Sequence, residues 1–219
     1  MEELSVKIQS LSFSIKSQEI LKEIDIAIKK YQFVGLVGPN GSGKTTLLKM
    51  INRLEDNTTG EVKINGKNVK EYNIHKMRWD IGYALQQVAL FPHMNVEENI
   101  AIVPELKKWK KEKINARIDE LLNMVGLEPE KYRKRKPSEL SGGEAQRVGI
   151  ARALAVNPKI IFADEPTGNL DTKTTSEVLD LMREIVRTQK QTLIMVTHDP
   201  VIANFADRQI KIVDGKISN

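Results

Sequence analysis

The sequence predicts an α/β fold in which a parallel core sheet is joined by an antiparallel edge sheet and an inserted helical lobe. A glycine-rich loop at 38–46 stands between an apolar run typical of a strand and a run with helical spacing. Two further apolar runs, at 160–164 and 192–197, lead into polar side chains. Because apolar strands that alternate with helices are typical of a buried parallel sheet, ligands are expected at the carboxyl ends of these strands.

The loop at 38–46 reads GPNGSGKTT and has the spacing of a P-loop, G-x-x-x-x-G-K-T. In such a loop, small residues let backbone N–H groups turn inward around phosphate oxygens, and the following helix adds the positive end of its dipole. Lys44 is expected to reach the β- and γ-phosphates of a nucleotide, and the Thr45 hydroxyl to be a ligand of Mg²⁺. A glycine-rich turn without this role is the weaker interpretation, because strand, loop and helix agree. The residues predicted to hold the phosphates are Gly38, Pro39, Asn40, Gly41, Ser42, Gly43, Lys44, Thr45 and Thr46.

Composition and length fit one compact globular unit. The chain has 219 residues, of which 40% are hydrophobic and 29% charged, and it lacks an apolar stretch of the roughly 20 residues that a membrane helix needs. It begins without a signal-peptide pattern and contains no cysteine, so we expect it in the cytosol, peripheral at the inner face of the cell membrane only through a partner. Disulfides and cysteine metal sites are excluded, and three histidines leave little for a zinc site.

The formal net charge of +5 is compatible with nucleic acid, an anionic membrane face or no specific partner. The basic residues form two clusters, at 107–113 and at 133–136. Apolar residues at helical spacing follow the first cluster, which favours a solvated helix face, and the second lies in a loop that ends at Pro137. Neither cluster has a nucleic-acid recognition motif, so no nucleic-acid partner is predicted. The apolar residues after the first cluster are Ile114, Ile118, Leu121 and Leu122.

The antiparallel edge sheet is predicted from the N-terminal part of the chain. Apolar residues recur through 4–8 and 20–28 with the spacing of antiparallel strands that flank a nucleotide. Residues 61–69 are expected to form a hairpin around the two-residue turn Asn65-Gly66, because this dipeptide suits the positive φ angles of such turns.

The helical lobe is predicted over about 87–155, between two parts of the core at about 1–86 and 156–219. Its pattern is broken by proline and glycine. The expected breaks lie at Pro104, at 126–129, at Pro137 and at 141–143. Asp214 and Gly215 mark a final turn, and no regulatory domain is expected after it.

Two carboxylates end the apolar run at 160–164. Asp164 lies at the tip of the predicted strand, where the Mg²⁺ of a bound nucleotide needs a negative ligand, usually through water. Glu165 can then orient or deprotonate an attacking water. An ion-paired glutamate at a strand end is the alternative, which the P-loop in the same chain disfavours.

The sequence LSGGE at 140–144 precedes a helical run and predicts a second phosphate-binding element. Ser141 is placed as the helix N-cap, and Gly142 and Gly143 permit an anion to approach the helix N-terminus closely. A capped turn without a ligand is the common interpretation of a single SGG, and only the other motifs disfavour it here.

These motifs, in this order, resemble the ATP-binding cassette ATPases over essentially the whole chain. The resemblance is carried by GPNGSGKTT, Gln86, LSGGE, IIFADEP at 160–166, GNLD at 168–171 and His198 in VTHD. It implies a P-loop NTPase with a RecA-like core, an edge sheet and a helical lobe. It also implies a head-to-tail homodimer with two ATP molecules sandwiched between the P-loop of one subunit and the LSGGE loop of the other.

The resemblance assigns chemical roles to residues of this sequence. Thr45, Asp164 and Gln86 serve Mg²⁺ or its water in this assignment. Glu165 is the catalytic base, and His198 contacts the γ-phosphate and helps to hold the water and Glu165 in position. The residues expected to take part in catalysis are Glu165, His198, Lys44 and Gln86.

Further roles follow from the same resemblance. Ser141 and Gly143 are expected to touch the γ-phosphate of the ATP bound to the opposite subunit, and Asp171 belongs to the loop that communicates between the two sites. The family usually has an aromatic residue that stacks on adenine, where this chain has Ile15. Phe13, on the same strand face by alternation, is the candidate substitute.

Two groups of transporter ATPase are similar to different parts of the chain. The segment after Gln86 resembles the ATPases of quaternary-amine and osmoprotectant importers, whereas DEPTGNLD and the segment from VTHD onward resemble those of lipoprotein-releasing and macrolide-type exporters. We favour the resemblance to importer ATPases, because in the family the region after the glutamine receives the membrane subunit. Against it, such importer ATPases commonly carry a C-terminal regulatory extension. The prediction is an importer ATPase that acts through a separate integral membrane permease, with a substrate-binding protein as a further partner; an exporter ATPase is the alternative.

Two other classes of protein fit less well. Soluble cassette ATPases that act on DNA or ribosomes typically contain two cassettes or a long coiled coil, for which the chain between Lys44 and Ser141 leaves little room. A nucleotide-binding module without catalysis is disfavoured by the presence of both Glu165 and His198.

Overall fold

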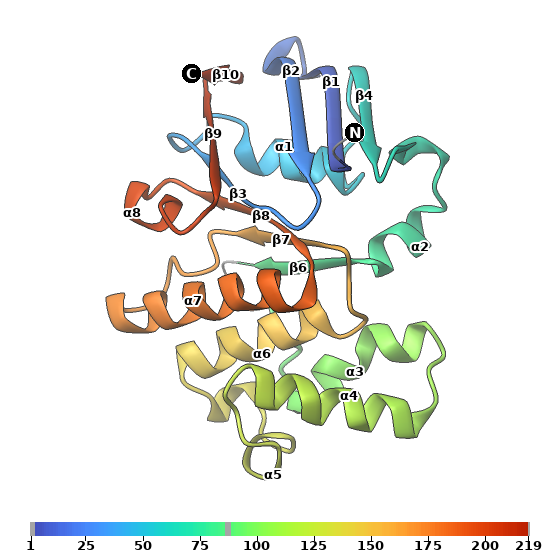
Figure 1. Cartoon of the computed structure of the whole chain (residues 1–219), viewed down its shortest axis with the longest axis vertical. Helices are drawn as coiled ribbons and strands as arrows, with labels where there is room; N and C mark the ends of the chain where they lie inside the picture. The colour runs from blue at the N-terminus through green and yellow to red at the C-terminus, as the bar shows by residue number, and fades with distance from the viewer. Residues whose placement is uncertain (1–2, 86–88, 219) are drawn as a thin grey trace. The chain divides into compact units, whose positions relative to one another are not determined.

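The computed structural model describes residues 3–85 and 89–218 (Figure 1). Their internal contacts divide the chain into two compact units, the first comprising Met1–Arg78 with Arg183–Asn219 and the second Trp79–Met182. The predicted division into a core of about 1–86 and 156–219 and a lobe of about 87–155 rests on the helical pattern of the sequence, and it stays a prediction.

The first unit contains a four-stranded antiparallel sheet in the order β2-β1-β4-β5 (Figure 1). Its strands are β1 (Leu4–Ile15), β2 (Gln18–Lys29), β4 (Thr59–Ile64) and β5 (Lys67–Asn68). In β2, the buried Ile24, Ile26 and Ile28 alternate with exposed residues, because successive side chains of a strand point to opposite faces of the sheet. The predicted antiparallel edge sheet is confirmed.

The hairpin between β4 and β5 turns at the predicted dipeptide. Asn65 and Gly66 have φ angles of 49° and 81°, and Ile64 pairs with Lys67 across the turn. The expected strand over 67–69 is one residue too long, because a short 3₁₀ helix, η1 (Val69–Glu71), begins at residue 69. The Asn68 side chain favours this ending by accepting a hydrogen bond from the backbone N–H of Lys70 at 2.9 Å.

The first unit also contains the parallel strands that precede the polar motifs. Strand β3 (Phe33–Val37) pairs in parallel with β8 (Thr192–Thr197) and with β9 (Arg208–Val213), and β10 (Lys216–Ser218) returns antiparallel to β9. Both β3 and β8 are almost entirely buried, as their apolar sequences require. The short connection from β9 to β10 is the predicted turn at Asp214 and Gly215, whose φ angles are 48° and 76°. The helices of this region are α1 (Lys44–Ile51), α2 (Ile74–Trp79) and α8 (Pro200–Ala203).

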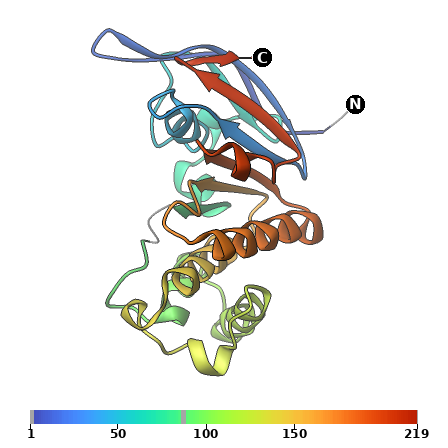
Figure 2. The ribbon, with the colours of Figure 1, turned by 90° about the vertical axis from the view of Figure 1, so that its left-hand side faces the viewer.

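The second unit combines a parallel strand pair with packed helices. Strand β6 (Ile81–Leu85) pairs in parallel with β7 (Ile160–Asp164). Helices α3, α4 and α6 pack against one another, and Figure 2 shows them grouped with α5. The helical segments are α3 (Val96–Leu106), α4 (Lys111–Met124), α5 (Pro129–Tyr132), η2 (Pro137–Glu139), α6 (Gly142–Leu154) and α7 (Thr172–Gln189), the last of which continues into the first unit. Together the two units confirm the predicted α/β fold.

The helix breaks are predicted correctly except at Pro104, which lies inside α3. A proline in a helix removes the N–H that would bond to the carbonyl four residues earlier, here that of Ile100. The helix continues because this loss falls near its end, where the N–H of Lys107 still donates to the carbonyl of Val103 at 2.9 Å. The proline ring is also buried, which offsets part of the cost.

The second basic cluster makes ion pairs within the second unit. The Arg133 guanidinium bonds to the carboxylates of Glu97 at 2.8 Å and Asp119 at 2.7 Å, and Lys134 also bonds to Glu97. The loop at 133–136 is therefore tied to α3 and α4.

In the part of the chain that the structure describes, no helix has both the length and the apolar character to cross a membrane.

A buried amide orders the segment before α3. The Asn99 side chain is fully buried, its Oδ1 accepts from the N–H of Phe91 at 2.8 Å, and its Nδ2 donates to the carbonyls of Met94 at 3.2 Å and Asn95 at 2.9 Å. One side chain thus closes the loop at 91–95 onto the helix. Buried polar groups that lose such partners destabilise a protein strongly.

Asn99→Ala should lower the free energy of unfolding by about 2–3 kcal/mol, because it removes the hydrogen bonds by which a fully buried side chain holds the backbone of the loop at 91–95. Urea titration followed by circular dichroism measures this change. Asn123→Ala, at an exposed position of α4, is the matched control and should change stability by about 0.5 kcal/mol or less. Equal stability of the two variants would contradict the role given to Asn99.

Candidate functional site

The phosphate loop at 38–46 links β3 to α1 in the first unit. Gly38 has a φ of 149°, and a Cβ atom there would lie 2.0 Å from the carbonyl oxygen of Ile212. Gly43 has a φ of 100°, and its Cβ would lie 2.6 Å from Leu21 Cδ2. The backbone therefore passes too close to its neighbours for a side chain at either position. This curled path is the one that a P-loop requires.

Three features of the loop fit a chain of phosphates. The Lys44 ammonium is held at the loop by the carbonyls of Gly38 and Pro39, each at 2.8 Å. Ser42 is 3% exposed, and its Oγ has no hydrogen-bond partner among the described residues. Helix α1 begins after Gly43 with no side-chain cap and no acidic residue in its first turn. A cation, an unpaired hydroxyl and an uncapped helix N-terminus together suit a polyanion.

The structure brings His198 to the same edge of the first unit as the phosphate loop. Val37 and Thr197 are partners at the carboxyl ends of the parallel strands β3 and β8, so Gly38 and His198 follow side by side. His198 is exposed. The backbone N–H of Asp199 donates to Thr197 Oγ1 at 3.1 Å, which fixes the direction of the chain after β8.

The two residues considered for adenine contact differ in burial. Phe13 is 8% exposed and belongs to the core, whereas Ile15 is 52% exposed at the end of β1. Simple alternation places both on one face, but the register of β1 against β2 shifts between Phe13 and Ser14. Of the two, Ile15 is the side chain that offers surface to a ligand.

The predicted acidic residues lie at the end of β7 in the second unit. Asp164 pairs with Leu85 at the carboxyl ends of the parallel strands β7 and β6. Glu165 follows with a φ of 47°, an uncommon angle for a residue with a side chain and one that is found often at functional sites. Gln86 lies outside the described residues. Within the described part of the chain, no group of three His, Cys, Asp or Glu side chains could hold a metal ion.

The LSGGE loop begins helix α6 with a complete capping box. Ser141 is the N-cap: its Oγ accepts from the N–H of Glu144 at 3.3 Å, while the Glu144 carboxylate accepts from the N–H of Ser141 at 2.7 Å. The predicted N-cap is confirmed. Ser141 and Gly142 are exposed, so an anion can reach this helix N-terminus.

Asp171 lies close to the LSGGE loop within the second unit. Its carboxylate accepts hydrogen bonds from the backbone N–H and the hydroxyl of Thr174, at 3.1 and 2.5 Å, and the hydroxyl bond lowers the pKa of the carboxyl group. Thr174 in turn packs against Gly143, where a Cβ atom would lie 2.7 Å from Thr174 Cγ2. Thr174 thereby connects two sequence motifs, because it contacts Gly143 of the LSGGE loop and bonds to Asp171 of GNLD.

Sequence reasoning did not single out Tyr132, whose hydroxyl donates to Glu144 Oε1 at 2.5 Å. The spacing of Ser141 and Glu144 is a capping-box signal and was available in the sequence. The tyrosine carried no such signal, because its contact with Glu144 depends on how α5 and α6 pack.

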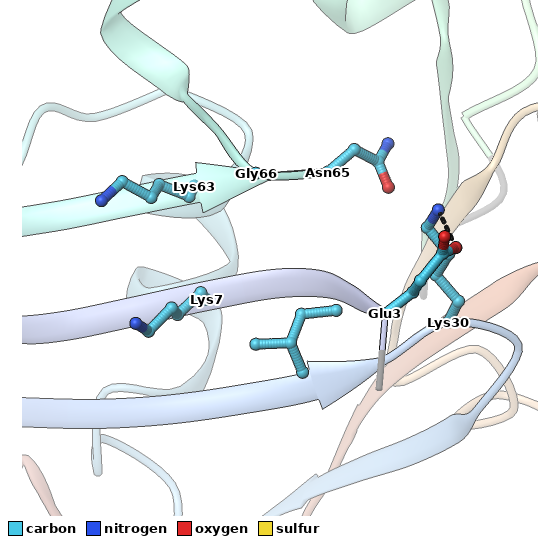
Figure 3. A pocket seen from close by; sticks show the side chains of 7 residues that line it. Glu3, Lys7, Lys30, Lys63, Asn65 and Gly66 are labelled. Carbon is cyan, nitrogen blue, oxygen red and sulfur yellow. Dashed lines mark hydrogen bonds and ion pairs between the residues drawn. The ribbon is translucent and has the colours of Figure 1, made fainter. Parts of the chain in front are cut away.

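A separate pocket lies beside the antiparallel sheet of the first unit (Figure 3). Its volume is about 290 Å³, and the residues that line it are Glu3, Leu4, Lys7, Lys30, Lys63, Asn65 and Gly66. Figure 3 shows the ion pair between Lys30 and Glu3, at 2.6 Å, with Lys7 and Lys63 extending side by side away from it. None of these residues belongs to the phosphate-binding or catalytic motifs predicted from the sequence.

Comparison with known proteins identifies similar sequences and structures. Residues 21–168 match the family described as ABC transporter. The chain is 42% identical over 214 residues to a glycine betaine/carnitine/choline transport ATP-binding protein, OpuCA of Bacillus subtilis (strain 168), covering 97% of this chain and 56% of that protein. It is 43% identical over 183 residues to a glycine betaine uptake system ATP-binding protein, YehX of Escherichia coli (strain K12), covering 84% and 59%.

A solved structure is similar over nearly the full length of both chains. It is the dimeric structure of a post-hydrolysis state of the ATP-binding cassette MJ0796, bound to ADP and Pi, with a TM-score of 0.87 and 36% identity. The match covers 98% of this chain and 97% of that one. By contrast, the chain spans little more than half the length of the two transport proteins it matches.

Gly38→Ala should weaken binding of a fluorescent ATP analogue about tenfold or more, because backbone strain of this kind costs on the order of 1–3 kcal/mol. The added Cβ meets a backbone oxygen, which cannot rotate away. Gly41→Ala is the matched control: its Cβ meets no atom within 4 Å, so only the φ of 79° opposes it and the loss should be smaller. Unchanged binding by Gly38→Ala would contradict the geometry given to the loop.

Proposed function

The chain belongs to the ABC transporter family, and from this premise we propose that it binds and hydrolyses ATP to power import of a quaternary amine or osmoprotectant through a separate permease. The observation that carries the ATP-binding part is the curled loop at 38–46, with its buried Lys44 and the unpaired Ser42 hydroxyl. The transport part is supported by the names of similar proteins.

In this proposal, the backbone N–H groups of the loop and the N-terminus of α1 bind the phosphates of ATP. Lys44, which the carbonyls of Gly38 and Pro39 hold at the loop, supplies the positive charge. Mg²⁺ bound with ATP neutralises phosphate charge, and Thr45, Asp164 and Gln86 serve the ion or its water.

Hydrolysis requires a base and a group that holds the γ-phosphate. Glu165 is proposed as the base that orients or deprotonates water, and its positive φ supports a position set by function. His198 is proposed to contact the γ-phosphate, and its exposed position beside the start of the phosphate loop supports this role.

Two copies of the chain are proposed to pair head to tail around two ATP molecules. The exposed N-terminus of α6 supports this arrangement, because Ser141 and Gly143 can meet a phosphate carried by another subunit. Asp171 accepts a hydrogen bond from Thr174, and Thr174 contacts Gly143 of that loop. These contacts support a role for Asp171 in communication between the two ATP sites. ATP bound between the two subunits then stabilises the closed dimer, and its hydrolysis opens the dimer.

The dimer does work through a permease, which holds it at the inner face of the cell membrane in this proposal. A substrate-binding protein completes an importer. The second candidate is an exporter ATPase of the lipoprotein-releasing or macrolide type, favoured by the sequence from DEPTGNLD onward. A soluble ATPase that acts on DNA or ribosomes is the third, with less support.

Glu165→Gln should reduce ATP hydrolysis about 10²-fold or more and trap an ATP-bound dimer, because the phosphates still bind but the general base is lost. Light scattering with ATP and Mg²⁺ measures the mass. Glu184→Gln, at an exposed position of α7, is the matched control and should leave both properties unchanged. A monomeric Glu165→Gln chain under these conditions would contradict the closure model.

Purification of the chain from its native membranes should recover a multi-span permease, identified by mass spectrometry. A permease that recruits a substrate-binding protein and whose ATP hydrolysis rises with a quaternary amine supports the importer. A permease without either property supports the exporter instead. Recovery of ribosomal or DNA-repair proteins with no membrane subunit would overturn the transport proposal and leave the ATPase assignment intact.

A further inference from the structure

We propose that Tyr132 is a positioning residue for the LSGGE loop, because its hydroxyl holds the carboxylate that caps that loop. The inference rests on the proposed function, in which Ser141 and Gly143 meet the ATP of the opposite subunit. Tyr132 touches neither ATP nor Ser141 in this account, and it acts through Glu144.

The Glu144 carboxylate joins Tyr132 to the loop by using both of its oxygens. Oε1 accepts the Tyr132 hydroxyl at 2.5 Å, and Oε2 accepts the backbone N–H of Ser141 at 2.7 Å. Ser141 Oγ accepts the N–H of Glu144 in return, at 3.3 Å. The backbone of Ser141 is therefore linked to the tyrosine through a single side chain.

The segment that carries Tyr132 is held in place by contacts of Arg135 and Arg133. The Arg135 guanidinium lies over its ring, 4.5 Å from the centroid. The next residue, Arg133, bonds to Glu97 on α3 at 2.8 Å and to Asp119 on α4 at 2.7 Å. The segment that carries the hydroxyl is thus held by contacts with two helices, which is what a group that positions another requires.

The bond to Glu144 is a charge-assisted hydrogen bond. The Tyr132 hydroxyl lowers the pKa of the Glu144 carboxyl, and the carboxylate raises the pKa of the tyrosine, as expected when a hydroxyl donates to an anion. Such bonds are roughly twice as strong as those between neutral groups. Gly142 and Gly143 have no side chains with which to order the loop, so this bond and the capping box order it together with the contact of Gly143 with Thr174.

Removal of the Tyr132 hydroxyl should therefore weaken ATP-driven dimerisation and leave the affinity of one subunit for ATP unchanged. The phosphate loop belongs to the first unit and the LSGGE loop to the second. A variant that loosens only the latter separates the two steps. A general loss of structure would instead change both.

Tyr132→Phe tests the proposal in two backgrounds. In the chain carrying Glu165→Gln, ATP-driven dimerisation should weaken about three- to tenfold, and in the otherwise unsubstituted chain kcat should fall by a similar factor. The affinity of the monomer for ATP should stay unchanged. Amide hydrogen exchange of the peptide that covers 140–145 should become faster, which reports the position of the loop without any need for activity.

Tyr72→Phe is the matched control, because it also removes a hydroxyl that donates a hydrogen bond, to the carbonyl of Ile64 at 2.9 Å in the first unit. It should leave dimerisation, kcat and exchange at 140–145 unchanged, with a similar small shift of Tm. In a Glu144→Gln chain, Tyr132→Phe should cost less than in the unsubstituted chain, since the two residues act through one bond.

Two results for Tyr132→Phe would overturn the inference and leave the proposed function intact. Dimerisation and exchange equal to those of the unsubstituted chain would show that the hydroxyl positions nothing, and weaker monomer binding of ATP with a large fall in Tm would show a general structural role. An unsubstituted chain that neither hydrolyses ATP nor dimerises with it would overturn the proposed function, and this inference with it.

Discussion

The curled backbone at 38–46 is the constraint on which the rest of the account depends. Gly38 passes so close to the Ile212 carbonyl, and Gly43 so close to Leu21, that a Cβ atom at either position would clash with its neighbour. That path leaves the N-terminus of α1 without a side-chain cap and brings the Lys44 ammonium onto the loop carbonyls. An uncapped helix N-terminus and a cation at one loop suit a chain of phosphates, which is why the proposed function places ATP there.

The N-terminus of α6 in the second unit differs from that of α1, because side chains of its own chain cap it. Helix α6 has a full capping box, in which the side chains of Ser141 and Glu144 each accept a hydrogen bond from the other residue's backbone N–H. Thr174 connects this loop to Asp171, and Tyr132 connects it to the ion pairs of Arg133. In the proposed dimer, an exposed helix N-terminus that is ordered in this way would lose little entropy on meeting a phosphate of the opposite subunit.

Local chemistry in the sequence predicted much of the fold and the local structure of the candidate loops, while the roles of the site residues stay predictions. The strand, loop and helix around GPNGSGKTT, the turn at Asn65-Gly66 and the N-cap at Ser141 each follow from residues close together in the chain. Predictions that depend on packing were less successful. Pro104 does not end α3, because its ring is buried and the lost bond falls near the helix end. Phe13 is in the core although alternation places it with the exposed Ile15.

The most direct measurement of the central claim is the rate of ATP hydrolysis by the purified chain as a function of its concentration. If two copies must close around ATP, the rate per subunit rises with protein concentration before it levels off, and Mg²⁺ is required. A rate per subunit that is constant from the lowest concentration, or no hydrolysis at any concentration, would contradict the account.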